Sequence, residues 1–106
     1  MQLSFDEIKE LLKGIVPSGG SHSFEIGKSY LIRTVTMFHV GRLTAVTDTD
    51  LVLSDASWVA DTGRFSDAIR TGNLNEIEPF ESRVIIGRGG IVDACEWKHS
   101  LPRNQK

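Results

Sequence analysis

The stretch that decides the fold reads Val40-Gly41-Arg42-Leu43-Thr44-Ala45-Val46-Thr47-Asp48-Thr49-Asp50-Leu51-Val52-Leu53-Ser54-Asp55-Ala56. Apolar and branched residues, which favour a pleated and half-buried surface, lie on both sides of residues 47–50. The Thr and Asp side chains between them hydrogen-bond their own backbone in tight turns. Gly41 inside a strand pattern marks a bend, a bulge or a close backbone approach. The stretch therefore predicts a bent hairpin at the centre of a small, strongly curved sheet.

Size and composition indicate one ordinary globular domain. The 106 residues suffice for a single core, so we expect one domain over residues 1–106. The formal charge of -2 argues against a protein that binds nucleic acid over its whole surface, but it leaves room for a local basic site. Cys95 is the only cysteine, which favours a reducing compartment. We find neither a secretion signal nor a membrane-spanning stretch, and we expect a cytoplasmic protein without a membrane partner.

Residues 4–13 form the clearest helix pattern. Ser4 and Glu7 make a capping box, and four apolar residues fall on one face: Phe5, Ile8, Leu11 and Leu12. We expect this helix to cover an open end or a face of the sheet, and a partner-binding helix is the alternative.

Strand patterns account for most of the remaining chain. Apolar residues lie on both alternating faces over residues 30–40, which is typical of a strand buried on both sides or sharply coiled. No Gly, Asn or Pro marks a turn between Thr34 and Val40, so the sequence does not place that strand break. The strand that follows the 47–50 turn is expected to run on through Trp58 and Val59. Residues 83–86 and 91–97 are the last two expected strands, separated by Gly87-Arg88-Gly89-Gly90.

Two further segments interrupt or follow these strands. Residues 61–79 form a long insertion, in which residues 66–70 predict one or two helical turns that end at Gly72. We expect Phe65, Ile69 and Leu74 to fold the insertion back on the sheet, and acidic connecting chain is expected over residues 73–79. Residues 98–106 are polar and are expected to form a flexible tail unless they dock. The predicted order is one helix and then five strands.

At two motifs the chain resembles the Sm/LSm-like family of RNA-binding rings, as a divergent member. The family's first motif has a glycine, a leucine two positions on, an acidic turn, an asparagine, and alternating apolar residues that end in acid-alanine. Gly41-x-Leu43 matches its start, and residues 50–56 match its end with Asp50 in the asparagine place. The second motif is an apolar run, Arg-Gly and a later apolar residue, which residues 84–91 resemble. The resemblance covers residues 4–60 and 80–97.

This resemblance implies a mainly β fold with an N-terminal α-helix. The family's fold is a strongly bent five-stranded open barrel, in which residues 61–79 would be a long insertion between strands 3 and 4. In such proteins the fourth strand of one subunit pairs with the fifth strand of the next. Because each free sheet edge is a liability that must be covered or paired, we expect a cyclic homo-oligomer of roughly five to seven subunits.

The resemblance also implies an RNA-binding site near the pore. Its residues would be Asp48, Thr49, Asp50, Arg88, Gly89 and Arg42, with Arg33 as a further arginine. Three departures weaken this match. The acidic turn is one residue shorter than in the family, Thr49 replaces the stacking aromatic or histidine and has no π face, and Gly87-Arg88 reverses the Arg-Gly order.

The leading hypothesis is a ring that binds single-stranded RNA, whose exposed bases permit edge recognition. The runner-up is a protein-only adaptor ring that displays residues 61–79, with Trp58, Phe65 and Phe80 as contact residues. The alternative to RNA binding is that these arginines pair with carboxylates at subunit interfaces, in a ring that binds no RNA. We do not expect an enzyme, because no base is paired with Cys95, and His39 is typical of a core or interface residue. No metal site and no cofactor are predicted, since aspartate-rich turns are usually only turns.

Overall fold

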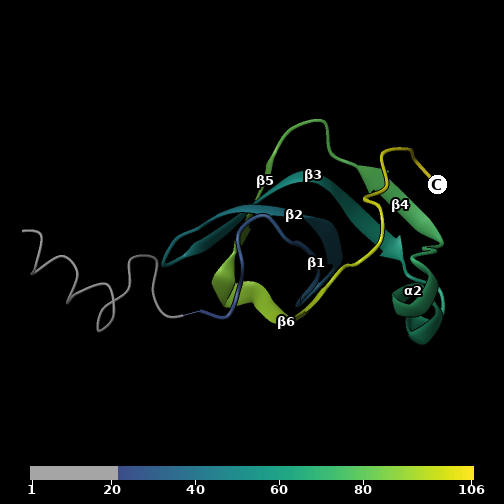
Figure 1. The fold of residues 1–106 in the computed structure, drawn as a ribbon, viewed down its shortest axis with the longest axis horizontal. Coiled ribbons are helices and arrows are strands. Elements are labelled where there is room, and N and C mark those ends of the chain that lie inside the picture. Colours follow the sequence, from purple (N-terminus) through teal and green to yellow (C-terminus); the bar gives the residue numbers. More distant parts are fainter. Residues whose placement is uncertain (1–21) are drawn as a thin grey trace, which may run out of the picture.

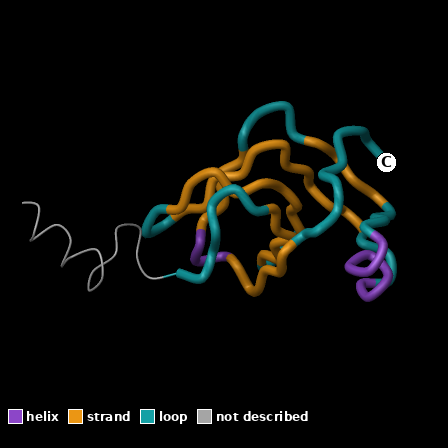
Figure 2. The backbone as a smooth tube through the Cα atoms, viewed as in Figure 1, coloured by secondary structure: helices purple, strands orange, loops and turns teal. Residues whose placement is uncertain are grey.

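The computed structural model describes residues 22–106, which fold into a mainly β structure (Figure 1). In this part of the chain, six strands form one antiparallel sheet with one α-helix (Figure 2). The elements are β1 (Ser29–Thr34), β2 (Phe38–Val46), β3 (Asp50–Asp61), α2 (Phe65–Thr71), β4 (Glu76–Pro79), β5 (Val84–Gly87), the 3-10 helix η1 (Arg88–Gly90) and β6 (Ile91–Glu96). The mainly β class predicted from the sequence is confirmed. The helix predicted over residues 4–13 lies outside the described residues.

The β2–β3 hairpin is the centre of the sheet, as the sequence predicts. The strand order is β4-β3-β2-β1-β6, and β5 also pairs with β3. The long strand β3 therefore has two partners on one side. Its first residues, from Asp50 to Leu53, pair with β5, and its last residues, from Ser57 to Asp61, pair with β4. The predicted continuation of this strand through Trp58 and Val59 is confirmed.

The bend of the hairpin has an identifiable cause at Gly41. The register of β2 and β3 shifts between Val40 and Arg42, and Asp55 on the opposite strand has a left-handed φ of 49°. An added Cβ at Gly41 would lie 2.8 Å from the Ala56 Cβ and 3.1 Å from the Ala56 Cα. The close approach predicted for Gly41 is thus confirmed, and the extra residue on β3 increases the local bend and twist.

Two hydrophobic clusters lie on opposite faces of the sheet. The first contains Tyr30 and Ile32 with residues of β2, β3 and β5. The second contains the intervening Leu31 with residues of α2, β4 and the segment after β6, including Ala68, Leu74, Ile77 and Trp97. Successive residues of a strand point to opposite faces, and both faces of β1 are buried. This explains the apolar residues on both faces of the predicted strand.

The 61–79 insertion covers the second cluster. α2 follows the predicted helical turns, and Gly72 ends it in the left-handed region at φ 77°. Leu74 is buried, whereas Phe65 stays 52% exposed and does not fold back fully. The prediction of connecting chain over residues 73–79 is wrong in part, because β4 forms there. Ile77 pairs with Val59 and is buried, so tertiary pairing outweighs the acidic composition.

The C-terminal segment, residues 98–106, is docked rather than a free tail. The Ile77 N–H donates to the Lys106 carbonyl and the Lys106 N–H donates to the Ile77 carbonyl, both at 2.9 Å. Ser57 Oγ donates to the Pro102 carbonyl at 3.1 Å. Leu101 also packs against the second cluster. Composition predicts a flexible tail, but these backbone partners and the apolar contact hold the segment against the sheet.

Candidate nucleic-acid interface at the 47–50 turn

The turn between β2 and β3 is closed by the side chain and the backbone of Thr47. Thr47 Oγ1 accepts hydrogen bonds from the Asp50 N–H at 2.9 Å and the Thr49 N–H at 3.3 Å. The Thr47 N–H donates to the Asp50 carbonyl at 2.9 Å. Thr47, Asp48 and Thr49 are all exposed. The turn is therefore a defined loop whose acceptor side chains face solvent at the end of the molecule opposite α2 (Figure 1).

Arg88 joins this turn from a distant part of the sequence. It begins η1, the short helix that connects β5 to β6. The Arg88 N–H donates to the Thr49 carbonyl at 2.7 Å, and Arg88 Nη1 donates to the Thr47 carbonyl at 2.6 Å. Because Gly87 pairs with Asp50 at the end of β5, η1 starts directly beside the turn. The two motifs that carry the sequence resemblance thus meet in space.

Gly89 lies next to Arg88 on an open surface. An added Cβ at Gly89 would meet no atom within 4 Å. Of the predicted site residues, the structure therefore brings five to one end of the sheet: Asp48, Thr49, Asp50, Arg88 and Gly89. Their chemistry combines one guanidinium with two carboxylates, one hydroxyl and exposed backbone groups.

Arg42 and Arg33 do not belong to this group. Arg42 lies opposite Ser54 in the bent middle of the hairpin. Its Nη2 is 2.8 Å from the Asp55 carboxylate and 3.0 Å from Ser54 Oγ. Arg33 forms an ion pair with Asp93 of β6, and that carboxylate raises the pKa of Arg33. Both arginines are thus held by carboxylates of the same chain, which the sequence could not show.

The free sheet edges are a second feature of the described chain. β5 pairs with β3 alone and β6 with β1 alone, although the two strands are joined by η1. Ile85 of β5 is 58% exposed and Val92 of β6 is 56% exposed. By contrast, Lys106 covers Ile77 on the outer edge of β4, and Pro79 of that strand has no N–H to offer. Among residues 22–106, the edges of β5 and β6 are therefore open and the β4 edge is blocked.

A third feature, missed by sequence reasoning, is a hollow beside α2. A space of about 290 Å³ is lined by Arg33, Phe38, Thr62, Phe65 and Asp93. A neighbouring hollow that shares Arg33 and Phe38 is bordered by the exposed Val35 and Met37. In the sequence, this surface is indicated only by Phe65, the aromatic residue directly before the predicted helical turns.

Three further observations concern the described residues. Trp58 and Phe80, which the adaptor hypothesis names with Phe65, are half-buried. Within residues 22–106, no group of three or more His, Cys, Asp or Glu side chains is arranged to hold a metal ion. In the same range no helix has the length and apolar character needed to cross a membrane.

Comparison with known proteins adds no further assignment. No protein-family model, curated protein or solved structure matches this chain.

Proposed function

We propose that this chain is an Sm-like protein that assembles into a ring and contacts single-stranded RNA through the 47–50 turn and η1. The observation that carries the proposal is the hydrogen bond from Arg88 Nη1 to the Thr47 carbonyl. It joins the two segments that resemble the family's motifs, which are about 40 residues apart in the sequence.

The ring is supported by the two open edges. An unpaired strand edge exposes a row of donors and acceptors that another chain can extend. Pairing β5 of one subunit with β6 of the next is a head-to-tail contact, which closes when the rotation between subunits divides a full turn. It would also remove Ile85 and Val92 from water. Since the β4 edge is blocked by Lys106 and Pro79, β5 and β6 are the edges left for this pairing.

The chemistry of the turn favours contacts with base edges over contacts with many phosphates. Asp48 and Asp50 repel phosphate, but their oxygens and the Thr49 hydroxyl accept or donate hydrogen bonds at exposed bases. Arg88 supplies one guanidinium, which can bind a base edge or one phosphate. Since threonine occupies position 49, the turn offers no aromatic ring there on which a base could stack. We therefore expect weak binding with a shallow dependence on salt.

Binding of fluorescent oligo-U and oligo-A at two salt concentrations tests the RNA contact. Arg88→Ala should weaken binding at least several-fold, because it removes the cation of the site. Arg70→Ala is the matched control, since Arg70 is exposed on α2 at the other end of the molecule and pairs only locally with Asp67. No binding at low salt, or equal loss in both variants, would contradict the proposal.

The oligomeric state is measured separately by light scattering. A mass of several subunits is expected at micromolar concentration, and replacing outward β5 residue Ile85 by lysine should reduce it. A monomeric wild-type chain under these conditions would rule out the ring.

A second candidate function is a protein-only adaptor ring. The specific observation in its favour is the apolar surface formed by Val35, Met37 and Phe65 next to the hollow beside α2. Exposed apolar patches often mark protein-binding sites. A ring that fails to bind either oligonucleotide at low salt would favour this function over the first.

A further inference from the structure

His39 is a buried titratable residue for which the proposed function has no role. It lies in β2, between Ile32 of β1 and Trp58 of β3, with only 7% of its surface exposed. Its Nδ1 is buried and has no hydrogen-bond partner in the described chain. One ring face stacks on Phe80, with 6.0 Å between the centroids and 18° between the planes. A neutral imidazole can be buried in this way at modest cost, whereas a charged imidazolium cannot.

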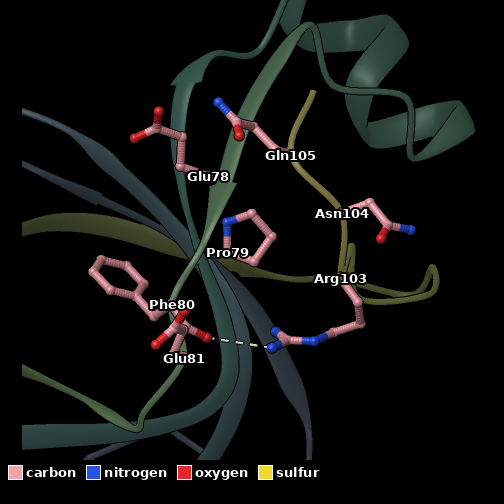
Figure 3. A pocket seen from close by; sticks show the side chains of 7 residues that line it. All are labelled: Glu78, Pro79, Phe80, Glu81, Arg103, Asn104 and Gln105. Atoms are coloured by element: carbon pink, nitrogen blue, oxygen red, sulfur yellow. Dashed lines mark hydrogen bonds between the residues drawn. The ribbon is translucent and has the colours of Figure 1, made fainter.

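Phe80 connects this histidine to the C-terminal segment. It lies just after β4, where its N–H donates to the Ala56 carbonyl at 2.9 Å. Its own carbonyl accepts a hydrogen bond from Arg103 Nη2 at 3.3 Å (Figure 3). Arg103 Nη1 lies 3.5 Å from the Ala56 carbonyl. We call this set of contacts the Phe80–Arg103 clasp. It borders an open hollow of about 470 Å³ between residues 78–81 and 103–105.

The charged groups around His39 do not stabilise a protonated ring. Glu78 of β4 pairs with Trp58, which pairs with His39 on its other side. Glu81 follows Phe80 in the sequence, and Arg103 belongs to the C-terminal segment. Arg33 of β1 lies on the other face, paired with Asp93. Burial lowers the pKa of His39, and no carboxylate offsets that effect.

We propose that protonation of His39 opens the Phe80–Arg103 clasp and frees Arg103 from the sheet, while the contacts of Pro102 and Lys106 stay in place. A protonated imidazole carries an N–H at both nitrogens, so Nδ1 becomes a donor without an acceptor and the ring carries a buried charge. Movement of Phe80 is the simplest way for water to reach Nδ1, because Phe80 lies outside the strands and is already partly exposed to solvent. Its movement takes away one carbonyl that holds Arg103, and the Arg103 cation leaves the neighbourhood of the new charge.

Amide exchange and histidine titration by NMR in the full chain, from pH 7.5 to pH 5, test whether the Phe80–Arg103 clasp opens. In the wild type, the Phe80 amide should lose protection in step with His39 protonation, after correction for the intrinsic exchange rate. The open state should gain up to about tenfold in population for each pH unit below the ordinary histidine pKa. His39→Phe should keep the amide protected throughout, and His39→Gln serves if the first variant does not fold. His22→Gln, which changes an exposed histidine, should behave as the wild type.

A second variant gives an independent readout. Phe80→Ala exposes the imidazole to water, so the pKa of His39 should rise toward its ordinary value. The proposal is refuted if His39 titrates while the Phe80 amide stays protected, or if Phe80→Ala leaves the pKa of His39 unchanged. It is equally refuted if the His39 variants, which lack the imidazole, open over the same pH range, because protonation of His39 would then not be the cause.

Discussion

Replacing Gly41 by alanine adds one methyl group at the point where β2 and β3 approach most closely. The new Cβ would lie 2.8 Å from the Ala56 Cβ, 3.1 Å from the Ala56 Cα and 3.2 Å from the Leu53 Cβ. Carbon atoms prefer separations of about 3.5–4.0 Å. None of these three atoms belongs to the far end of a flexible side chain, so relief requires the strands to separate. We expect Gly41→Ala to destabilise the fold by about 1–3 kcal/mol, the usual cost of overpacking.

Urea unfolding followed by circular dichroism measures this cost, with the free energy of unfolding obtained by linear extrapolation. Each variant is compared at several protein concentrations, because the proposed ring assembly would shift apparent stability by mass action. Gly87→Ala is the matched control, since Gly87 also lies in a strand and its added Cβ would meet nothing within 4 Å. It should change stability by no more than about 1 kcal/mol, and loss of unfolded-state freedom makes a gain possible.

A double variant isolates the contact itself. Adding Ala56→Gly to Gly41→Ala removes the nearest clashing atom, so part of the lost stability should return relative to the sum of the single changes. Coupling of about 0.5–3 kcal/mol is expected for residues in direct contact. If Gly41→Ala is as stable as Gly87→Ala, or if the two changes are simply additive, close approach at Gly41 is not what shapes the hairpin.

Two further predictions concern the strained bulge and the insertion. Asp55 has a left-handed φ of 49°, so Asp55→Val should cost about 1–2 kcal/mol more than Asp55→Asn, because asparagine tolerates this conformation and valine does not; equal urea midpoints for the two variants would argue against strain at this position. Leu74 is 1% exposed in the second cluster, so Leu74→Ala should lower the free energy of unfolding by about 2–5 kcal/mol. Phe65→Ser on the exposed end of α2 should change it by about 0.5 kcal/mol or less, and a similar loss in both variants would show that the insertion does not pack as described.

The sequence by itself determined the mainly β class, the central hairpin, the close approach at Gly41 and the short helix that ends at Gly72. These features depend on local chemistry: branched residues on a pleat, aspartates in a turn, and glycine where a Cβ does not fit or φ is positive. The convergence of Arg88 with the 47–50 turn was expected only through the family resemblance.

Only the tertiary structure decided the break between β1 and β2, the existence of β4 and the position of the C-terminal segment. Thr34 closes the first turn through Oγ1, which donates to the Met37 carbonyl at 2.9 Å, and no glycine or proline signals it. β4 exists because β3 on one side and Lys106 on the other supply its hydrogen-bond partners. Arg42 pairs with Asp55 rather than joining the turn, since the bulge sets their relative positions. Each of these outcomes depends on residues that are distant in sequence, and neither local pattern nor composition carries that information.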